Sequence, residues 1–346
     1  MHRIISPLVA AACSAAIAIR AAGQTASPIA VHVDSARHTV ILSAGPFELP
    51  IASDDMSADA HGGGMNAHTL AVPLLRFIWP VDGWIRGIKV RVIDRAGRPL
   101  PRELVHHLMV INFGRRELLY PQAERLIAVG QETPDVHLPS TIGIPVTTAT
   151  PMAVIMAWHN AGHDPVSGAI VEVSVEWSPP RTAPRPISVL PVPVNIFYPV
   201  GRAGDFDLPP GPMQWTADVS FPLSGHILVA GGHQHDFGTG FEFQEVTAGG
   251  SRSIFRLGTK LTSEGHLLSV DRITPGAAGD GIKLATDHKY RMIATYNNRT
   301  GKTLVNGAMA NLVLLFSPDH LEAWPALSAS DPEYRRDLRY LESLGQ

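Results

Sequence analysis

Apolar and polar residues alternate along several short stretches of the chain. Residues 88–92 read Ile-Lys-Val-Arg-Val, and residues 171–177 read Val-Glu-Val-Ser-Val-Glu-Trp. A period of two places the apolar side chains on one face of an extended strand, so both stretches predict half-buried strands. Long helical periodicity is absent until the C-terminal tail, where Ser330 or Asp331 can cap a helix with Pro332 in its first turn. The pattern predicts an all-β body with a short C-terminal helix.

A proline-dense segment marks the expected domain boundary. Residues 178–186 read Ser-Pro-Pro-Arg-Thr-Ala-Pro-Arg-Pro, a composition that favours extended chain and is not compatible with a central strand. It divides the chain into two parts of similar length. We therefore expect two tandem antiparallel β-sandwich, jelly-roll-like domains at residues 24–178 and 194–325. A Pro-rich linker over 179–193 would join them, and a helical tail over 326–346 would follow.

The first 23 residues have the pattern of a secretory signal peptide. Arg3 precedes an apolar run over residues 4–19, and small residues follow at 21–23. The alternatives are an uncleaved membrane anchor and a lipoprotein acylated at Cys13. No later stretch reaches the ~18 apolar residues that a membrane-spanning helix needs. We expect an exported protein, periplasmic or secreted, with no transmembrane span in its mature form.

Charge and composition narrow the class of function. The chain has 28 Lys and Arg residues against 31 Asp and Glu residues, so the net charge of −3 does not favour binding to nucleic acid. Sixteen histidines stand against a single cysteine. This excludes a disulfide scaffold, a cysteine-based zinc module and an iron–sulfur protein. Imidazole remains as the abundant side chain that can bind a metal.

Two histidine pairs are candidate metal ligands. His233 and His235 are two residues apart, so on a strand both imidazoles point to one side and can bind one copper, zinc, iron or nickel ion. The alternative is a pair of surface histidines beside a turn. His106 and His107 are adjacent and point to opposite faces of an ideal strand. They can share one ion only at a strand end or at a β-bulge.

Met309 lies in an apolar segment and is a core residue unless histidines converge on it. A thioether with two imidazoles would favour copper, because soft sulfur binds Cu(I) well. Asp236 follows the second histidine pair directly. It either orients an imidazole through a hydrogen bond or caps a turn.

Four segments resemble, in their order along the chain, the copper type II ascorbate-dependent monooxygenases, the family of peptidylglycine α-hydroxylating and dopamine β-monooxygenases. They are Val105-His106-His107-Leu108, Ile142-Gly143-Ile144-Pro145 before Trp158-His159-Asn160, His233-Gln234-His235, and Met309-Ala310-Asn311-Leu312. The resemblance covers residues 85–320, which is most of the mature chain.

The resemblance implies two β-sandwiches with one copper ion each, facing one another across an open cleft. His106 and His107 would hold a relay copper. His233, His235 and Met309 would hold a catalytic copper that binds dioxygen. The family's third relay histidine aligns with Ala157, which cannot bind metal. His159 is therefore the expected substitute.

His163 is the fallback for that third ligand. Ascorbate or a similar reductant would reduce the copper, and dioxygen would hydroxylate a C–H bond of a small-molecule substrate. Asn311 matches the peptide-amidating branch of the family. The arginine and tyrosine that this branch uses to bind a peptide carboxylate are replaced by Gly231 and Val313, so peptide amidation is not expected.

Two other functions remain open from the sequence. The first is a non-catalytic copper-binding protein on the same fold. The second is a glycan-directed, amidase-like hydrolase, since an amidase that releases N-glycans has paired sandwiches. It would need a cluster of catalytic acids, and no such cluster is evident in the sequence.

Overall fold

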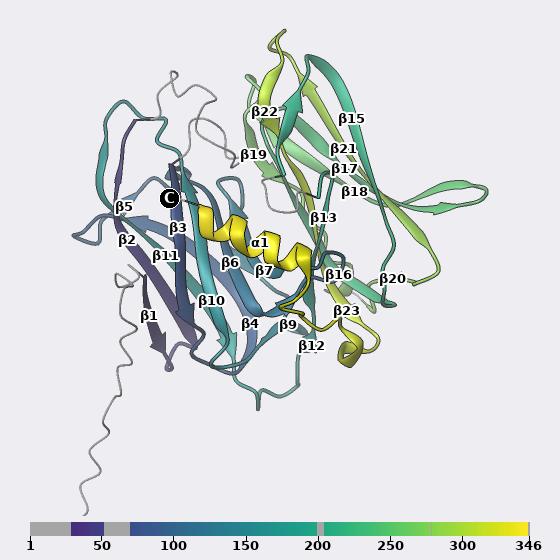
Figure 1. The fold of residues 1–346 in the computed structure, drawn as a ribbon, viewed down its shortest axis with the longest axis horizontal. Coiled ribbons are helices and arrows are strands. Elements are labelled where there is room, and N and C mark those ends of the chain that lie inside the picture. Colours follow the sequence, from purple (N-terminus) through teal and green to yellow (C-terminus); the bar gives the residue numbers. More distant parts are fainter. Residues whose placement is uncertain (1–28, 52–69, 199–203, 278, 345–346) are drawn as a thin grey trace, which may run out of the picture.

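The chain folds into two tandem antiparallel β-sandwiches with one short C-terminal helix, as the sequence pattern predicts (Figure 1). The structure, a computed structural model, describes residues 29–51, 70–198, 204–277 and 279–344. The expected signal peptide, with Cys13, lies outside these residues, so export stays a prediction. No helix in the described ranges is long and apolar enough to cross a membrane.

The first sandwich has two sheets. One sheet has the order β1 (Ile29–Asp34), β2 (Thr39–Leu49), β11 (Val166–Ser178), β4 (Gly83–Ile93), β9 (Ile142–Val146) and β12 (Ile187–Ser188), with β5 (Pro99–Leu100) and β8 (Val136–His137) also paired to β4. The other has the order β3 (Leu70–Ile78), β10 (Pro151–Trp158), β6 (Val105–Arg116) and β7 (Ala123–Gly130), with a 3-10 turn η1 (Arg102–Leu104) before β6. All these pairs are antiparallel except β9 with β12.

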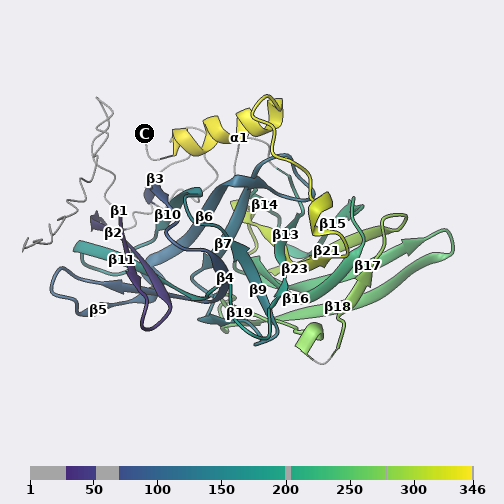
Figure 2. The ribbon, with the colours of Figure 1, turned by 90° about the horizontal axis from the view of Figure 1, so that it is seen from below.

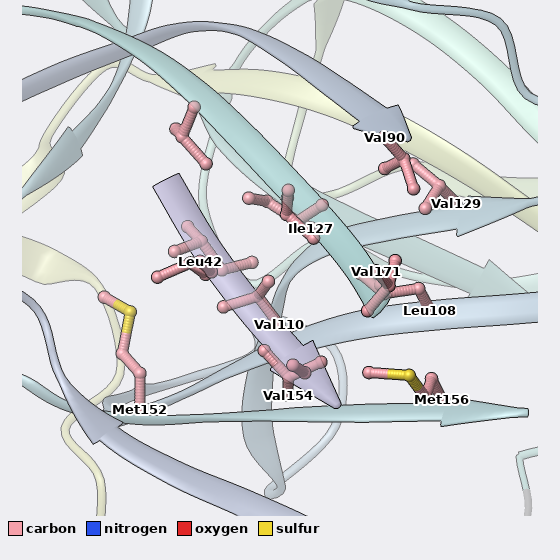
Figure 3. Packing of buried hydrophobic residues seen from close by; sticks show 14 of the residues in the cluster. Leu42, Val90, Leu108, Val110, Ile127, Val129, Met152, Val154, Met156 and Val171 are labelled. Carbon is pink, nitrogen blue, oxygen red and sulfur yellow. The ribbon is translucent and has the colours of Figure 1, made fainter. Parts of the chain in front are cut away.

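The alternating stretches form the inner face of this sandwich. Val90 of β4 pairs with Val173 of β11, and both are buried while their charged neighbours face outward. Figure 3 shows the side chains that fill the space between the sheets, among them Leu42, Val90, Leu108, Val110, Ile127, Val129, Met152, Val154, Met156 and Val171. Period-2 patterning therefore identified strands that do bury one face.

The second sandwich is built in the same way. One sheet has the order β13 (Leu190–Asn195), β23 (Ala310–Pro318), β16 (Gly225–Gln234) and β20 (Ile282–Leu284). The other has the order β15 (Gly211–Val219), β21 (Lys289–Asn298), β17 (Gly238–Thr247), β18 (Gly250–Leu261) and β19 (Leu267–Val270). A separate pair joins β14 (Phe206–Leu208) to β22 (Leu304–Ala308), and short 3-10 turns are η2 (Pro275–Ala277) and η3 (Leu321–Ala323).

Two strands begin inside the segment expected to be a linker. β12 pairs with β9, and β13 starts at Leu190. β13 tolerates Pro191 and Pro193 because it is an edge strand, where missing N–H donors need no partner on the open side. Leu190 is buried in the core of the first sandwich, and Val192 is buried in the core of the second. The chain therefore enters the second core before the prolines end.

The helix α1 (Pro332–Ser343) begins as the sequence predicts. The Asp331 carboxylate accepts hydrogen bonds from the backbone N–H groups of Glu333 and Tyr334, which satisfies two free donors of the first turn. The helix returns to the first sandwich and lies over the sheet that contains β6 and β7 (Figures 1 and 2). Tyr334 and Leu341 are buried there in a small apolar cluster.

The two sandwiches pack side by side. Leu228 and Val229 of β16, in the second sandwich, belong to the buried core of the first. The indole N–H of Trp324 donates to the carbonyl of Arg116, a further bond between the two parts of the chain. This packing places the beginning of β6 next to the end of β16. Those two strand ends carry the histidine pairs.

Candidate metal centre

A β-bulge lets the adjacent histidines of β6 face the same region. Ala157 of β10 pairs with His107, whereas the next residue, Trp158, pairs with Val105. His106 is thus an extra residue on β6, and its backbone carbonyl accepts a hydrogen bond from Gln131 instead. The extra residue breaks the two-residue alternation, so the rings of His106 and His107 lie with their centres 4.1 Å apart. The bulge that the sequence requires for a shared ion is present.

The second histidine pair lies against the first. The Nε2 atoms of His107 and His233 are 2.9 Å apart, and the ring centres of His106 and His235 are 5.8 Å apart. Candidate ligand atoms of His106, His107 and His235 all lie within 4.8 Å of one another. Nitrogens that bind one ion at 2.0–2.1 Å are separated by at most about 4.2 Å, so small side-chain movements bring these three to a common ion. We call His106, His107, His233 and His235 the histidine cluster.

Several nitrogens of the histidine cluster are buried without a hydrogen bond. Nε2 of His106 and both ring nitrogens of His235 have no partner among the described residues. Unpaired buried polar atoms cost free energy, and a bound metal ion is one partner that would satisfy imidazole nitrogens. Imidazole nitrogens without thiolates suit copper, zinc, iron or nickel, so the residues present fit a transition metal.

Three members of the histidine cluster, His106, His107 and His235, are held in their neutral form. Burial lowers the pKa of His106 to about 4, and the neighbouring His233 lowers it further in the same direction. Burial lowers the pKa values of His107 and His235 well below the usual range. A neutral imidazole keeps the lone pair that binds a metal, whereas a protonated one does not. At neutral pH these three side chains are therefore ready to bind a cation.

Glu132 fixes the orientation of His233. The carboxylate, almost fully buried just after β7, lies 2.8 Å from Nδ1 of His233. Burial raises the pKa of Glu132, but the charge and hydrogen bond of His233 outweigh it, so the net pKa is lowered. An anionic carboxylate accepts the Nδ1–H and leaves Nε2 directed at the cluster.

Two glycines make room for this arrangement. A Cβ atom on Gly130 would lie 2.1 Å from the Glu132 carboxylate, and a Cβ on Gly232 would lie 2.6 Å from the ring of Phe241. Neither distance is possible without movement of the neighbour. The absence of a side chain at Gly130 therefore allows Glu132 to fold back toward His233.

Two cavities border the histidine cluster, and His233 lines both of them. The polar cavity, of about 430 Å³, is lined by His106, His233 and His235 together with charged groups that include Glu132 and Lys302. The apolar cavity, of about 330 Å³, is lined by His107, His233 and Met309 and by many aliphatic side chains from both sandwiches. Met309, between β22 and β23, is thus in the same cavity as two of the histidines.

The other residues proposed from the sequence divide into two groups. His159 is near the cluster, with its ring centre 6.1 Å from that of His106. Its backbone N–H donates a hydrogen bond to the carbonyl of Leu104. Asn311 pairs with His233 across β23 and β16 and lines the apolar cavity. His163 is exposed and is not in the group of possible ligands.

Asp236 does not orient either histidine of its own motif. Its carboxylate bonds to Nδ1 of His266 at 2.7 Å and accepts the backbone N–H of Leu267 at 2.8 Å. It therefore stabilises the chain that leads into β19. The contact between Asp236 and His266 could not be predicted from local spacing, because thirty residues separate the two.

Sequence reasoning also missed Glu132 and the meeting of the two histidine pairs. Glu132 lies close to Asp135 and His137 in the chain, and no local pattern distinguishes it from them as the partner of His233. The preceding Gly130 was the only local sign of a close approach. The resemblance implied two separated coppers, whereas the structure places both pairs in one cluster at the contact of the sandwiches.

Comparisons with known proteins add only distant structural likenesses. No protein-family model and no curated protein matches this chain. An atomic structure of Sulfolobus Turreted Icosahedral Virus is 13% identical with a TM-score of 0.39, over 79% of this chain and 94% of that one. PNGase F, a glycosylasparaginase from Flavobacterium meningosepticum, is 8% identical with a TM-score of 0.37, over 80% and 96%. The major capsid protein P2 of bacteriophage PM2 is 14% identical with a TM-score of 0.33, over 73% and 98%.

Proposed function

We propose that this chain is a copper-dependent monooxygenase whose metal is bound by the histidine cluster. The observation that carries the proposal is the set of buried, unpartnered nitrogens on His106 and His235 beside the Nε2 atoms of His107 and His233. The ligand atoms that the described residues bring together are imidazole nitrogens, which suit copper among other metals. Met309 lines the adjoining cavity, and a thioether ligand from it would favour copper over zinc.

The protein's own groups would have defined tasks. When bound, copper would supply one-electron chemistry with dioxygen and a reductant such as ascorbate for hydroxylation of a C–H bond. Glu132 holds the Nδ1–H of His233 and so keeps its Nε2 pointed at the centre. The apolar cavity would offer a small-molecule substrate an aliphatic surface in the space that His107 and Met309 also line. The polar cavity offers a separate approach to His106 and His235 for a reductant.

Metal analysis followed by oxygen uptake tests the proposal. The purified full chain is reconstituted with copper, dialysed and assayed for copper content and for ascorbate-dependent consumption of dioxygen. We expect tightly bound copper and oxygen uptake that requires both copper and ascorbate. A content of one copper per chain corresponds to a shared centre, and two correspond to separate filling of the two pairs.

A matched pair of variants ties the result to the cluster. His235→Ala removes a buried ligand, whereas His163→Ala removes an exposed histidine outside the cluster. We expect loss of copper from the first variant and an unchanged content in the second. A wild-type protein that retains no copper defeats the proposal. Copper binding without oxygen uptake would support the non-catalytic copper protein, and metal-independent cleavage of a glycopeptide would support the amidase-like alternative.

A further inference from the structure

Arg272 is held in the wall of the apolar cavity by β16. The backbone groups of Ile273 and Ala230 exchange two hydrogen bonds of 2.9 Å, which fix the segment after β19 against this strand. A Cβ on Gly231 would lie 3.8 Å from Cγ and Nε of Arg272. Because Gly231 has no side chain, the aliphatic part of the Arg272 side chain can lie close to β16, near His233.

The charge of Arg272 has no acid opposite it. Within the described part of the chain, Arg272 makes no ion pair and no hydrogen bond, and the residue is exposed to solvent at the mouth of the cavity that it lines. Desolvation by the surrounding protein lowers its pKa, and no carboxylate offsets that effect. An unpaired guanidinium in the wall of a cavity can bind an anion through charge-assisted hydrogen bonds.

The other charged groups that line the apolar cavity are already satisfied. Arg125 binds Asp337 at 2.6 Å, and His137 lies 3.4 Å from Glu176. The carboxyl group of Glu117 accepts a hydrogen bond from the side chain of Gln122. Arg272 is thus the one arginine of the described lining that is available to a ligand.

We propose that the apolar cavity binds a small molecule with an apolar body and one carboxylate, and that Arg272 binds the carboxylate. A guanidinium matches a carboxylate with two parallel hydrogen bonds. A volume of about 330 Å³ lies within the range of small-molecule sites, and its aliphatic lining suits an apolar body. The inference names a substrate class for the proposed function and rests on it only in identifying the bound molecule as the substrate.

Calorimetric titration with octanoate and octan-1-ol tests the site. The two probes have the same apolar chain and differ in the charged group. The full chain is used after removal of metal by a chelator, so that a carboxylate cannot bind to copper directly. We expect octanoate to bind at least about tenfold more tightly than octan-1-ol, as one charge-assisted pair provides.

Substitution of Arg272 provides the second part of the experiment. Arg272→Gln is expected to weaken octanoate binding about tenfold and to leave octan-1-ol binding unchanged, which also shows that the cavity is intact. Arg181→Gln, at an exposed arginine in the Pro-rich segment, is expected to change neither affinity.

Equal affinities for the two probes, no binding of either, or an unaltered octanoate affinity in Arg272→Gln would overturn the inference. Its failure is distinguishable from failure of the proposed function. A chain that binds octanoate through Arg272 but retains no copper refutes only the copper monooxygenase. A chain that consumes oxygen with copper but does not prefer octanoate refutes only the carboxylate site.

Discussion

His106 shows how one residue can change the chemistry that a strand offers. Adjacent histidines on a regular strand face opposite ways, and the extra residue in the bulge removes that restriction. The sequence alone shows that a bulge or a strand end is needed for both rings to reach one ion, because His106 and His107 are adjacent in it. It does not locate the bulge, since that depends on how β6 pairs with β10, about fifty residues later. The requirement could therefore be predicted, but not the geometry.

Loss of the Glu132 carboxylate is expected to weaken metal binding. Glu132→Gln keeps the shape of the side chain but removes the charge that holds His233 Nδ1–H. Partners of this kind typically contribute about 10–100-fold in metal affinity. Copper affinity is measured by competition with a chelator of known affinity. Glu103→Gln, at an exposed acid just before β6, is the control, and equal affinities in the two variants would contradict the role given to Glu132.

A methyl group at Gly130 tests the space beneath that carboxylate. In Gly130→Ala the new Cβ would lie 2.1 Å from Glu132, which forces the carboxylate away from His233. We expect a loss of about 1–3 kcal/mol in unfolding free energy, together with weaker copper binding. In Gly249→Ala the nearest atom is 4.0 Å away, so this control should have near wild-type stability. Denaturant unfolding measures both variants, and equal stabilities would show that the Glu132 side chain moves without cost.

At the scale of elements, the sequence was most informative where structure is local. Alternation marked β4 and β11, and the Asp331–Pro332 pair marked the beginning of α1. The same reasoning placed a linker over residues that include the start of β13. Proline density indicates extended chain, but edge strands are also extended, and only tertiary packing distinguishes the two.

The docking of α1 is expected to depend on one buried ion pair. Asp337 is 2% exposed, and its carboxylate binds the guanidinium of Arg125 of β7 and accepts the backbone N–H of Ala123. Asp337→Ala leaves the buried guanidinium unpaired and should cost about 3–5 kcal/mol in unfolding free energy.

The same helix provides the control for this prediction. Glu342 pairs with Arg76, with about half of each side chain exposed, so Glu342→Ala should cost no more than about 1 kcal/mol. Thermal and denaturant unfolding of the two variants should therefore differ clearly. Similar losses in both would mean that burial does not determine the strength of these pairs.

At the scale of the whole molecule, the meeting of the two histidine pairs lay beyond the sequence. His107 and His233 are 126 residues apart, and their contact depends on the packing of one sandwich against the other. Motif order named the ligands from both halves. It did not determine their separation, because no local pattern encodes the relative position of two sandwiches. The cluster follows from side chains such as Val229, which one half buries in the core of the other.

Global stability should carry a pH-dependent contribution from Glu117. Burial raises the pKa of this carboxyl from 4.5 to about 7, although Arg125 and Gln122 act in the opposite direction. Between these values the folded chain retains a proton that the unfolded chain has lost. The contribution is therefore fully present below pH 4.5 and is lost as pH rises through 7. Its upper size is roughly 3 kcal/mol.

Glu117→Gln isolates this contribution, because the glutamine stays neutral. The histidines titrate in both proteins, so their effect cancels in the difference between variant and wild type. We expect the variant to gain stability relative to wild type on going from pH 5 to pH 8, measured by denaturant unfolding. A difference that is constant over this range would show that Glu117 does not titrate there.

The contact between the sandwiches also sets how the centre and the fold depend on each other. Each half supplies two imidazoles, and only their apposition completes the set. The polypeptide between the halves therefore acts as a tether that raises the effective concentration of one bidentate fragment toward the other. The packing of the two sandwiches favours metal binding at the centre. By thermodynamic linkage, a bound metal ion would stabilise this packing by the same free energy.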